Sequence, residues 1–121
     1  MNLRERKKLI LLVDDESKVL RFMEIELKLF GYDVMTATRG RQALEMVRTA
    51  TPDLMLLDIA MPEMNGFEVL HELRGFSRMP VIALSASISN GQPAIEAGAN
   101  EFHTKPFKMR DLVTRIENYL S

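Results

Sequence analysis

Five side chains suited to phosphoryl or metal chemistry each follow an extended, largely apolar segment. Asp14 and Asp15 come after the first such segment, Asp58 after the third, Ser85 after the fourth and Lys105 after the fifth. The run before Asp58 is apolar throughout, which indicates a strand that is buried on both faces. A carboxylate at the mouth of such a core is unfavourable unless positive charge meets it. The sequence must therefore supply or recruit a cation beside Asp58.

The residue types point to a specific chemistry. Two carboxylates about 5 Å apart repel each other by roughly 3 kcal/mol at an effective dielectric constant near 20, and a hard divalent cation relieves this repulsion. Oxygen ligands with open positions suit Mg²⁺ or Mn²⁺. Zinc prefers nitrogen or sulfur, and neither His71 nor His103 is spaced to provide it. With the ammonium of Lys105 and the hydroxyl of Ser85, these are the parts needed to move a phosphoryl group onto Asp58.

Each of these residues also has an ordinary structural interpretation. An acidic pair such as Asp14 and Asp15 commonly complements a helix dipole. Asp58 before Met-Pro suits a turn, Ser85 a satisfied hydroxyl at a strand end, and Lys105 a surface charge beside a proline. Taken singly, these interpretations are favoured, and the site hypothesis depends on all five residues reaching one edge of one sheet.

The pattern of apolar residues predicts elements that would bring the five residues to one edge. Apolar runs and helical periodicity alternate along the chain. We expect strands at 9–13, 32–37, 54–57, 81–84 and 101–104, and helices at 18–30, 41–48, 67–74 and 111–120. A short fourth helix is expected within 87–98, beginning near Pro93. Ser17 is expected to cap the first helix. Such alternation predicts a parallel sheet with helices on both faces, which binds ligands at the carboxyl ends of its strands. The second strand delivers no comparable group to that edge.

Composition excludes several classes of function. The chain has 121 residues, no cysteine and a formal net charge of −1, which suits one domain without disulfides and gives no general attraction to nucleic acid or membranes. We interpret residues 1–7 as a basic lead-in and 8–121 as a single domain. The apolar run after the lead-in is too short for a signal peptide or a membrane span, so we expect a cytoplasmic protein.

Four motifs carry a resemblance to a known family. From about Lys8 to Leu120 the chain resembles the receiver domain of two-component response regulators, in the segments LLVDDE, LLDIAMPEMNG, LSA and GANEFHTKPF. The resemblance implies a flavodoxin-like α/β/α sandwich with a five-stranded parallel sheet of order 2-1-3-4-5 and five helices. It also implies that the domain accepts a phosphoryl group on Asp58 from a histidine kinase, a histidine phosphotransfer protein or a small phosphodonor.

The resemblance assigns the remaining roles residue by residue. Asp14 and Asp15 match the Mg²⁺-binding acids, which act with Asp58 and the main-chain carbonyl of Ala60, and Lys105 matches the phosphoryl-binding lysine. Such a domain is not an enzyme in the usual sense, although it catalyses its own phosphorylation and dephosphorylation. Its signal passes to an output domain or a partner protein of unknown identity, and a homodimer is left open.

Ser85 and Phe102 match the family's switch hydroxyl and switch aromatic, and the bond Lys105–Pro106 matches one that is usually cis. Serine in place of threonine is less confined in χ1, and phenylalanine in place of tyrosine lacks a hydroxyl, so an output contact here must be steric or apolar. Gly91 and Pro93 interrupt the segment 87–98, which predicts a truncated, mobile fourth helix and an altered output face.

Two other classes of function compete with a phosphorylated switch. A pseudo-receiver would serve as a constitutive interaction domain, and it would be favoured by loss of the acids or of Lys105, all of which are present. A small enzyme on the same fold is the other class. A flavodoxin needs a phosphate-binding loop where this chain has Asp14 and Asp15, and a haloacid-dehalogenase-type phosphatase needs an acid where Ala60 stands.

Overall fold

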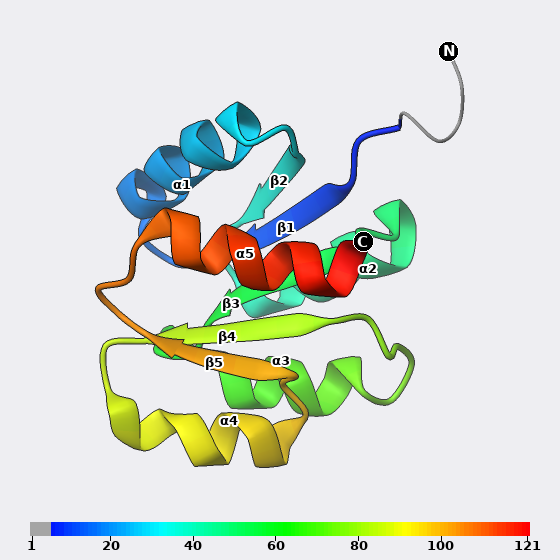
Figure 1. Ribbon diagram of the computed structural model, residues 1–121. Helices are drawn as coiled ribbons and strands as arrows, with labels where there is room; N and C mark the ends of the chain where they lie inside the picture. Colours follow the sequence, from blue (N-terminus) through cyan, green and yellow to red (C-terminus); the bar gives the residue numbers. More distant parts are fainter. Residues whose placement is uncertain (1–5) are drawn as a thin grey trace.

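Strands and helices alternate along the chain, as the apolar pattern predicts. The computed structural model describes residues 6–121 (Figure 1). The elements are β1 (Leu9–Val13), α1 (Ser17–Leu29), β2 (Asp33–Ala37), α2 (Gly40–Ala50), β3 (Leu54–Asp58), α3 (Gly66–Leu73), β4 (Val81–Ser85), a 3₁₀ turn η2 (Ile88–Asn90), α4 (Gly91–Ala97), β5 (Glu101–Thr104) and α5 (Met109–Leu120). Residues 1–5 of the basic lead-in predicted at 1–7 lie outside the described residues.

The five strands form one parallel sheet in the order β2-β1-β3-β4-β5, which confirms the predicted flavodoxin-like topology. β3 lies at the centre, between β1 and β4. The direction of strand addition reverses between β1 and β3, so a crevice forms beyond their carboxyl ends. In the register, Val13 is opposite Leu57 and Asp58 is opposite Leu84. Asp14 and Asp58 therefore lie at nearly the same level at the end of the sheet.

Two hydrophobic cores lie on opposite faces of the sheet, because successive side chains of a strand point in opposite directions. Leu12 and Leu56 pack with α1 and α5, whereas Leu11 and Leu57 pack with α2, α3 and α4. In Figure 1, α1 and α5 cover one face and α3 and α4 the other. Burial on both faces explains why the central strands are continuous apolar runs. Each fully buried leucine contributes about 1.5 to 3 kcal/mol to folding.

The first helix begins one residue earlier than predicted, and the predicted capping role of Ser17 is wrong. Glu16 occupies the N-cap position and Ser17 is already helical. No side chain of residues 6–121 caps the helix, but in the loop just before it Oδ1 of Asp14 accepts a hydrogen bond of 2.9 Å from the backbone N–H of Glu16. This bond fixes one carboxylate oxygen of Asp14 at the start of the loop that leads into α1.

The fourth helix is short, as predicted, with seven residues. It begins at Gly91, two residues before the predicted start at Pro93, and η2 directly precedes it. Pro93 lies in the first turn of α4, where the missing N–H leaves no intrahelical hydrogen bond unmade. The helix ends at Ala97, and the residue that follows it, Gly98, has a φ of 122°, which suits glycine.

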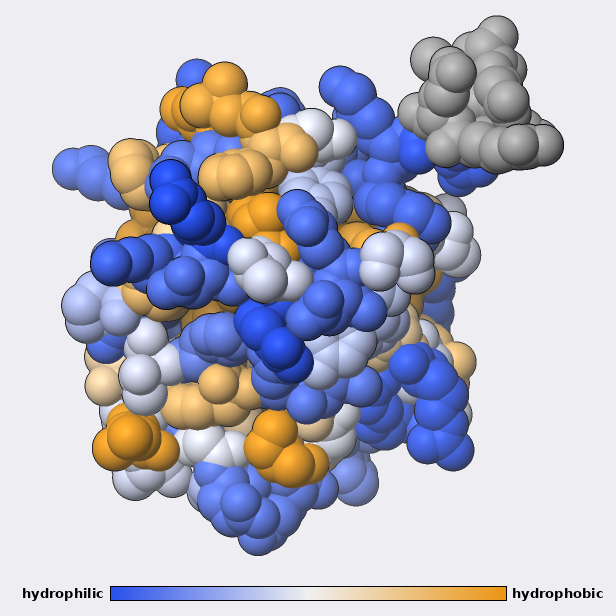
Figure 2. All heavy atoms as spheres, in the orientation of Figure 1, coloured by the Kyte–Doolittle hydropathy of each residue, from blue (hydrophilic) through white to orange (hydrophobic). Residues whose placement is uncertain are grey.

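Hydrophobic side chains are unevenly distributed on the surface. In the view of Figure 2 the face over α5 is mainly hydrophilic, and hydrophobic side chains gather over the end of α1. Phe22, Ile25, Leu29 and Phe30 are the exposed apolar residues of this helix and of the position directly after it. Across residues 6–121, none of the helices combines the length and the apolar character needed to cross a membrane.

Candidate functional site

Three carboxylates meet at the carboxyl edge of the sheet. Asp14 and Asp15 come after β1, and Asp58 is the last residue of β3, so one oxygen from each lies within 4.8 Å of the others. Asp14 and Asp58 are only 4% and 6% exposed, whereas Asp15 faces solvent. A set of carboxylate oxygens that is open on one side fits a hard divalent cation such as Mg²⁺ or Mn²⁺, which keeps several of its waters.

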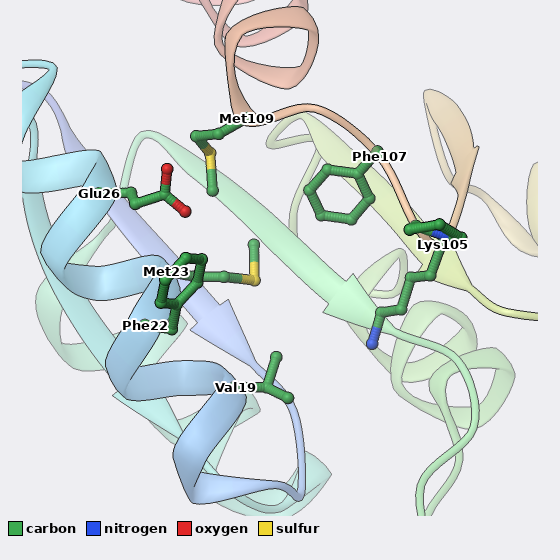
Figure 3. Close-up of a pocket in the computed structure, with 8 residues that line it drawn as sticks. Val19, Phe22, Met23, Glu26, Lys105, Phe107 and Met109 are labelled. Carbon is green, nitrogen blue, oxygen red and sulfur yellow. The ribbon is translucent and has the colours of Figure 1, made fainter.

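Lys105 brings the cation that the sequence requires beside Asp58. Its Nζ lies 3.1 Å from Oδ2 of Asp14 and 3.5 Å from Oδ1 of Asp58. Figure 3 shows the side chain reaching from the loop after β5 to the tip of β3. The bond to Pro106 is cis, as the resemblance implied. The backbone N–H of Lys105 donates to the carbonyl of Ser85 at 2.9 Å, which ties this loop to the end of β4.

Burial and neighbouring charges set the protonation of the site. Burial, together with the smaller influence of the Asp14 charge, raises the pKa of the Asp58 carboxyl from its ordinary 3.8 to about 6, against the opposing influence of Lys105 and of the Ala60 backbone N–H. Burial alone would lower the pKa of the Lys105 ammonium, but the charges of Asp14 and Asp58 outweigh it and raise that pKa overall. One ammonium shared between two buried carboxylates leaves net negative charge, which a divalent cation would neutralise.

Ser85 lies at the same edge and is almost completely buried, with 1% of its surface exposed. Its Oγ accepts two hydrogen bonds, from the backbone N–H of Ser87 at 3.1 Å and from Nδ2 of Asn90 at 2.9 Å. Sequence reasoning missed Asn90, which is one polar residue among several in a loop. Only the conformation of η2 brings its amide back to Ser85.

Phe102 lies on β5, away from the carboxylates, and packs against the core shared by α2, α3 and α4. Its ring rests against Gly91 at the start of α4. Ala60 is exposed and its backbone N–H faces the carboxylate of Asp58, while the predicted role of its carbonyl as a metal ligand stays a prediction. His71 is exposed on α3, and His103 lies 2.8 Å from Glu101 on β5.

The carboxyl end of β2 contributes more than the sequence suggested. Arg39 lies just beyond this strand and lines a hollow together with Asp15, Thr38, Pro62 and Glu63. Its guanidinium is 4.0 Å from the carboxylate of Glu63, and both side chains are exposed. The expectation that the second strand delivers no comparable group is therefore incomplete. A charged residue two positions past a strand gives no sequence signal that separates it from any other surface arginine.

A second, apolar hollow of about 210 Å³ lies on the other side of Lys105. Met23 of α1 points across it toward Phe107, just before α5, and Met109, the first residue of α5 (Figure 3). Val19, Phe22 and Glu26 complete its α1 wall. The stem of Lys105 thus borders an apolar groove, while its ammonium reaches the carboxylates.

Comparison with known proteins identifies this arrangement. Residues 10–117 match the family described as "Response regulator receiver domain". The chain belongs to this family. Transcriptional regulatory protein KdpE of Mycobacterium tuberculosis is 41% identical to the receiver domain over 110 residues, which are 89% of this chain and 49% of KdpE. The chain therefore spans about half the length of the curated relatives it matches.

Solved structures of other receiver domains superimpose closely on this one. The receiver domain of Francisella response regulator 1452 gives a TM-score of 0.87 at 30% identity and covers 93% of this chain and 96% of that one. The BeF3-activated N-terminal receiver domain of RstA from Klebsiella pneumoniae gives a TM-score of 0.88 at 30% identity, with 93% and 98% covered. The family and the fold inferred from the four motifs are both confirmed.

Proposed function

We propose that Asp58 accepts a phosphoryl group in a reaction that depends on Mg²⁺, and that the resulting change of conformation is the signal of this receiver domain. The observation that carries the proposal is the placement of Lys105 within 4 Å of both Asp14 and Asp58 at the crevice of the sheet. The donor is the phosphohistidine of a histidine kinase or of a histidine phosphotransfer protein, or a small phosphodonor.

The chemistry is a transfer between two nucleophiles. A carboxylate oxygen of Asp58 attacks phosphorus, the bond from phosphorus to the donor imidazole nitrogen breaks, and its electron pair stays on that nitrogen. With a pKa of about 6, the Asp58 carboxyl is largely ionised at neutral pH and is available as the nucleophile. The product is an aspartyl phosphate. Attack of water on its phosphorus breaks the bond to the Asp58 oxygen, releases inorganic phosphate and restores Asp58, so the domain sets its own phosphoryl lifetime without being a conventional enzyme.

Other residues would hold the transferred group. The ammonium of Lys105 would bind phosphoryl oxygens, and the hydroxyl of Ser85 would donate to one of them. Asp14, Asp15, Asp58 and the Ala60 carbonyl would hold Mg²⁺ or Mn²⁺, which would neutralise charge at the phosphoryl oxygens. The acidic cluster supports this assignment, because its oxygens lie within 4.8 Å of one another.

The signal passes either to an output domain in a longer protein or to a separate partner protein. KdpE is named as a transcriptional regulatory protein and is about twice as long as this chain, so we infer an output in transcription that this domain controls without itself contacting nucleic acid. We expect a protein with such a role to be cytoplasmic and not bound to a membrane. Self-association of the phosphorylated domain would be one way of passing on the signal.

The proposal is tested by incubation with acetyl phosphate and Mg²⁺, followed by mass spectrometry of the intact protein. We expect an adduct with the mass of one phosphoryl group, stable in acid and labile in base, that depends on Mg²⁺. Asp58→Asn, which keeps the size of the side chain, should form none. Failure of the wild type with both this donor and a cognate kinase would favour the pseudo-receiver, and an adduct that persists in Asp58→Asn would show that another residue is the acceptor.

A further inference from the structure

Two consecutive residues of this chain contact both side chains of the expected switch. Asn90 ends η2 and its Nδ2 donates to Oγ of Ser85 at 2.9 Å. Gly91 begins α4, and a Cβ placed on it would lie 3.1 Å from the nearest ring atom of Phe102. We propose that the pair Asn90–Gly91 couples Ser85 to Phe102, so that a movement of the buried hydroxyl displaces the aromatic ring. The inference rests on the proposed function, since it begins with phosphorylation of Asp58.

The first half of the coupler is a positioning contact. A serine oxygen can accept two hydrogen bonds and donate one. Both acceptor places of Ser85 Oγ are filled, by Ser87 N–H and by Asn90 Nδ2, so its own proton is left to donate. With 1% of Ser85 exposed, bulk water has little access to replace a lost amide. When Ser85 donates to a phosphoryl oxygen and shifts toward Asp58, Asn90 must move with it or lose its bond.

The second half of the coupler is a steric contact. Glycine lets the backbone of α4 lie directly on the aromatic ring, and the ring atoms Cδ2 and Cε2 of Phe102 are 3.1 and 3.3 Å from the position a Cβ would take. The Gly91 backbone therefore has little room to move toward the ring without displacing it. Phe102 has no hydroxyl with which to bond Ser85 directly, so this contact offers another way for the two residues to communicate.

Two hydrogen bonds hold the turn that joins the two contacts. The backbone N–H of Asn90 donates to the carbonyl of Ser87 at 3.1 Å, and the N–H of Ser87 donates to Ser85 Oγ. The segment 85–90 is thus a small hydrogen-bonded unit, and α4 continues from it without an intervening residue. A displacement of Ser85 is transmitted to the start of α4 and not absorbed in a loop.

The test compares the phosphorylation-dependent shift of the Phe102 ring resonances in the wild type and in Asn90→Ala, at equal extents of aspartyl phosphate measured by mass spectrometry. We expect the shift per phosphorylated molecule to fall by roughly half or more in the variant. Ser89→Ala is the matched control, because Ser89 lies in the same turn, is exposed, and bonds Ser87 and not Ser85. It should respond like the wild type. Asn90→Leu, similar in size but without a donor, serves if Asn90→Ala folds poorly.

Two further variants separate coupling from general damage. In a Ser85→Ala background, Asn90→Ala should cause no additional loss, since its partner is already absent. Gly91→Ala should move the Phe102 resonances before phosphorylation. Gly75→Ala should not, although its Cβ would also make a tight contact, 3.2 Å from the carbonyl of Glu72.

The outcomes distinguish the two proposals. An unchanged Phe102 response in Asn90→Ala and Asn90→Leu, with normal aspartyl phosphate, would overturn the coupler and leave the proposed function intact. Absence of the adduct in the wild type would overturn the proposed function, and the coupler with it.

Discussion

At the scale of single residues, Asp58 occupies a position that is chemically useful and energetically unfavourable. It is buried beside a second buried carboxylate, and the two share one ammonium. Burial is the larger cause of its raised pKa and Asp14 the next. The same features that make the metal-free carboxylate unstable leave it poised to bind cations and to react with phosphorus. Reactivity at this position is therefore linked to a loss of folding free energy.

We expect Asp58→Asn to stabilise the metal-free protein at pH 7 by about 1 to 3 kcal/mol, because it removes a carboxylate charge that burial and the neighbouring Asp14 make unfavourable. The folded-state pKa of about 6 lies above the ordinary value of 3.8. The wild type should therefore be most stable relative to the variant below pH 4 and lose that advantage as the pH rises through 6. Urea unfolding in EDTA between pH 4 and pH 7 measures this difference. A variant that is less stable than the wild type at pH 7 would contradict the expectation.

At the scale of elements, α4 is the least self-sufficient helix of the domain. An isolated helix shorter than about 12 to 15 residues is marginal in water, and α4 has seven residues, of which Ala94 alone is buried. Each end of the helix is held by hydrogen bonds of a side chain outside the helix. Asn90 anchors the beginning, and Arg74, just after α3, anchors the end by donating to the carbonyl of Gly98 at 2.9 Å.

Arg74 also ties this end of α4 to the loop before β4. Its guanidinium donates to the carbonyls of Met79 and Ser77, at 2.9 and 3.1 Å, and to the side chain of Asn100. Burial lowers the pKa of Arg74, which nonetheless remains charged at neutral pH. Hydrogen bonds to a charged group contribute about 1.5 to 3 kcal/mol each, although a partly exposed set sums to less.

We expect the amides of α4 to exchange with solvent faster than those of α5 in the wild type, and faster still in Arg74→Met, which loses the anchor at Gly98. Arg78→Met is the matched control, since Arg78 is exposed and four residues away, and it should leave the exchange rates of α4 unchanged. Hydrogen exchange measured by mass spectrometry or NMR tests both expectations. Full protection across residues 88–97 in the wild type would refute the idea of a mobile fourth helix.

At the scale of the whole molecule, a charge cluster fastens the last helix to the edge of the sheet. Glu101 on β5 accepts hydrogen bonds from Arg115 and Tyr119 of α5, and it pairs with His103 on its own strand. The hydrogen bond from Arg115 is the largest cause that lowers the pKa of the Glu101 carboxyl, to about 2. Because α5 covers one face of the sheet, this cluster bears on the integrity of the domain.

The cluster predicts a specific sensitivity to acid. The pKa of Glu101 is lowered in the folded state from 4.5 to about 2, so its contribution to stability is complete above pH 4.5 and is lost as the pH falls toward 2. We expect the melting temperature of Glu101→Gln to be lower than that of the wild type at pH 7 and to approach it at pH 2 to 3. Calorimetry at several pH values measures both. A constant difference between the two proteins across this range would contradict the assignment.

Periodicity in the sequence predicted the sheet and its functional edge, whereas contacts that depend on loop geometry could not be predicted. The carboxyl ends of parallel strands share an edge, so the meeting of Asp14, Asp58 and Lys105 could be foreseen from their places after apolar runs. The contact between Asn90 and Ser85 depends on a 3₁₀ turn that no simple sequence pattern predicts. Ser17 was expected to cap α1, but it is already helical, and Asp14 bonds the N–H of Glu16 in the adjoining loop.

The sheet separates two sides of the molecule that carry different features. The stem of Lys105 borders the groove between α1 and α5, whereas Phe102 faces α4 across the other core. The buried strands lie between the two helical layers, whose buried side chains form two separate cores. Sequence changes in the groove between α1 and α5 and changes around α4 can therefore accumulate as two independent series, since the residues concerned belong to separate cores.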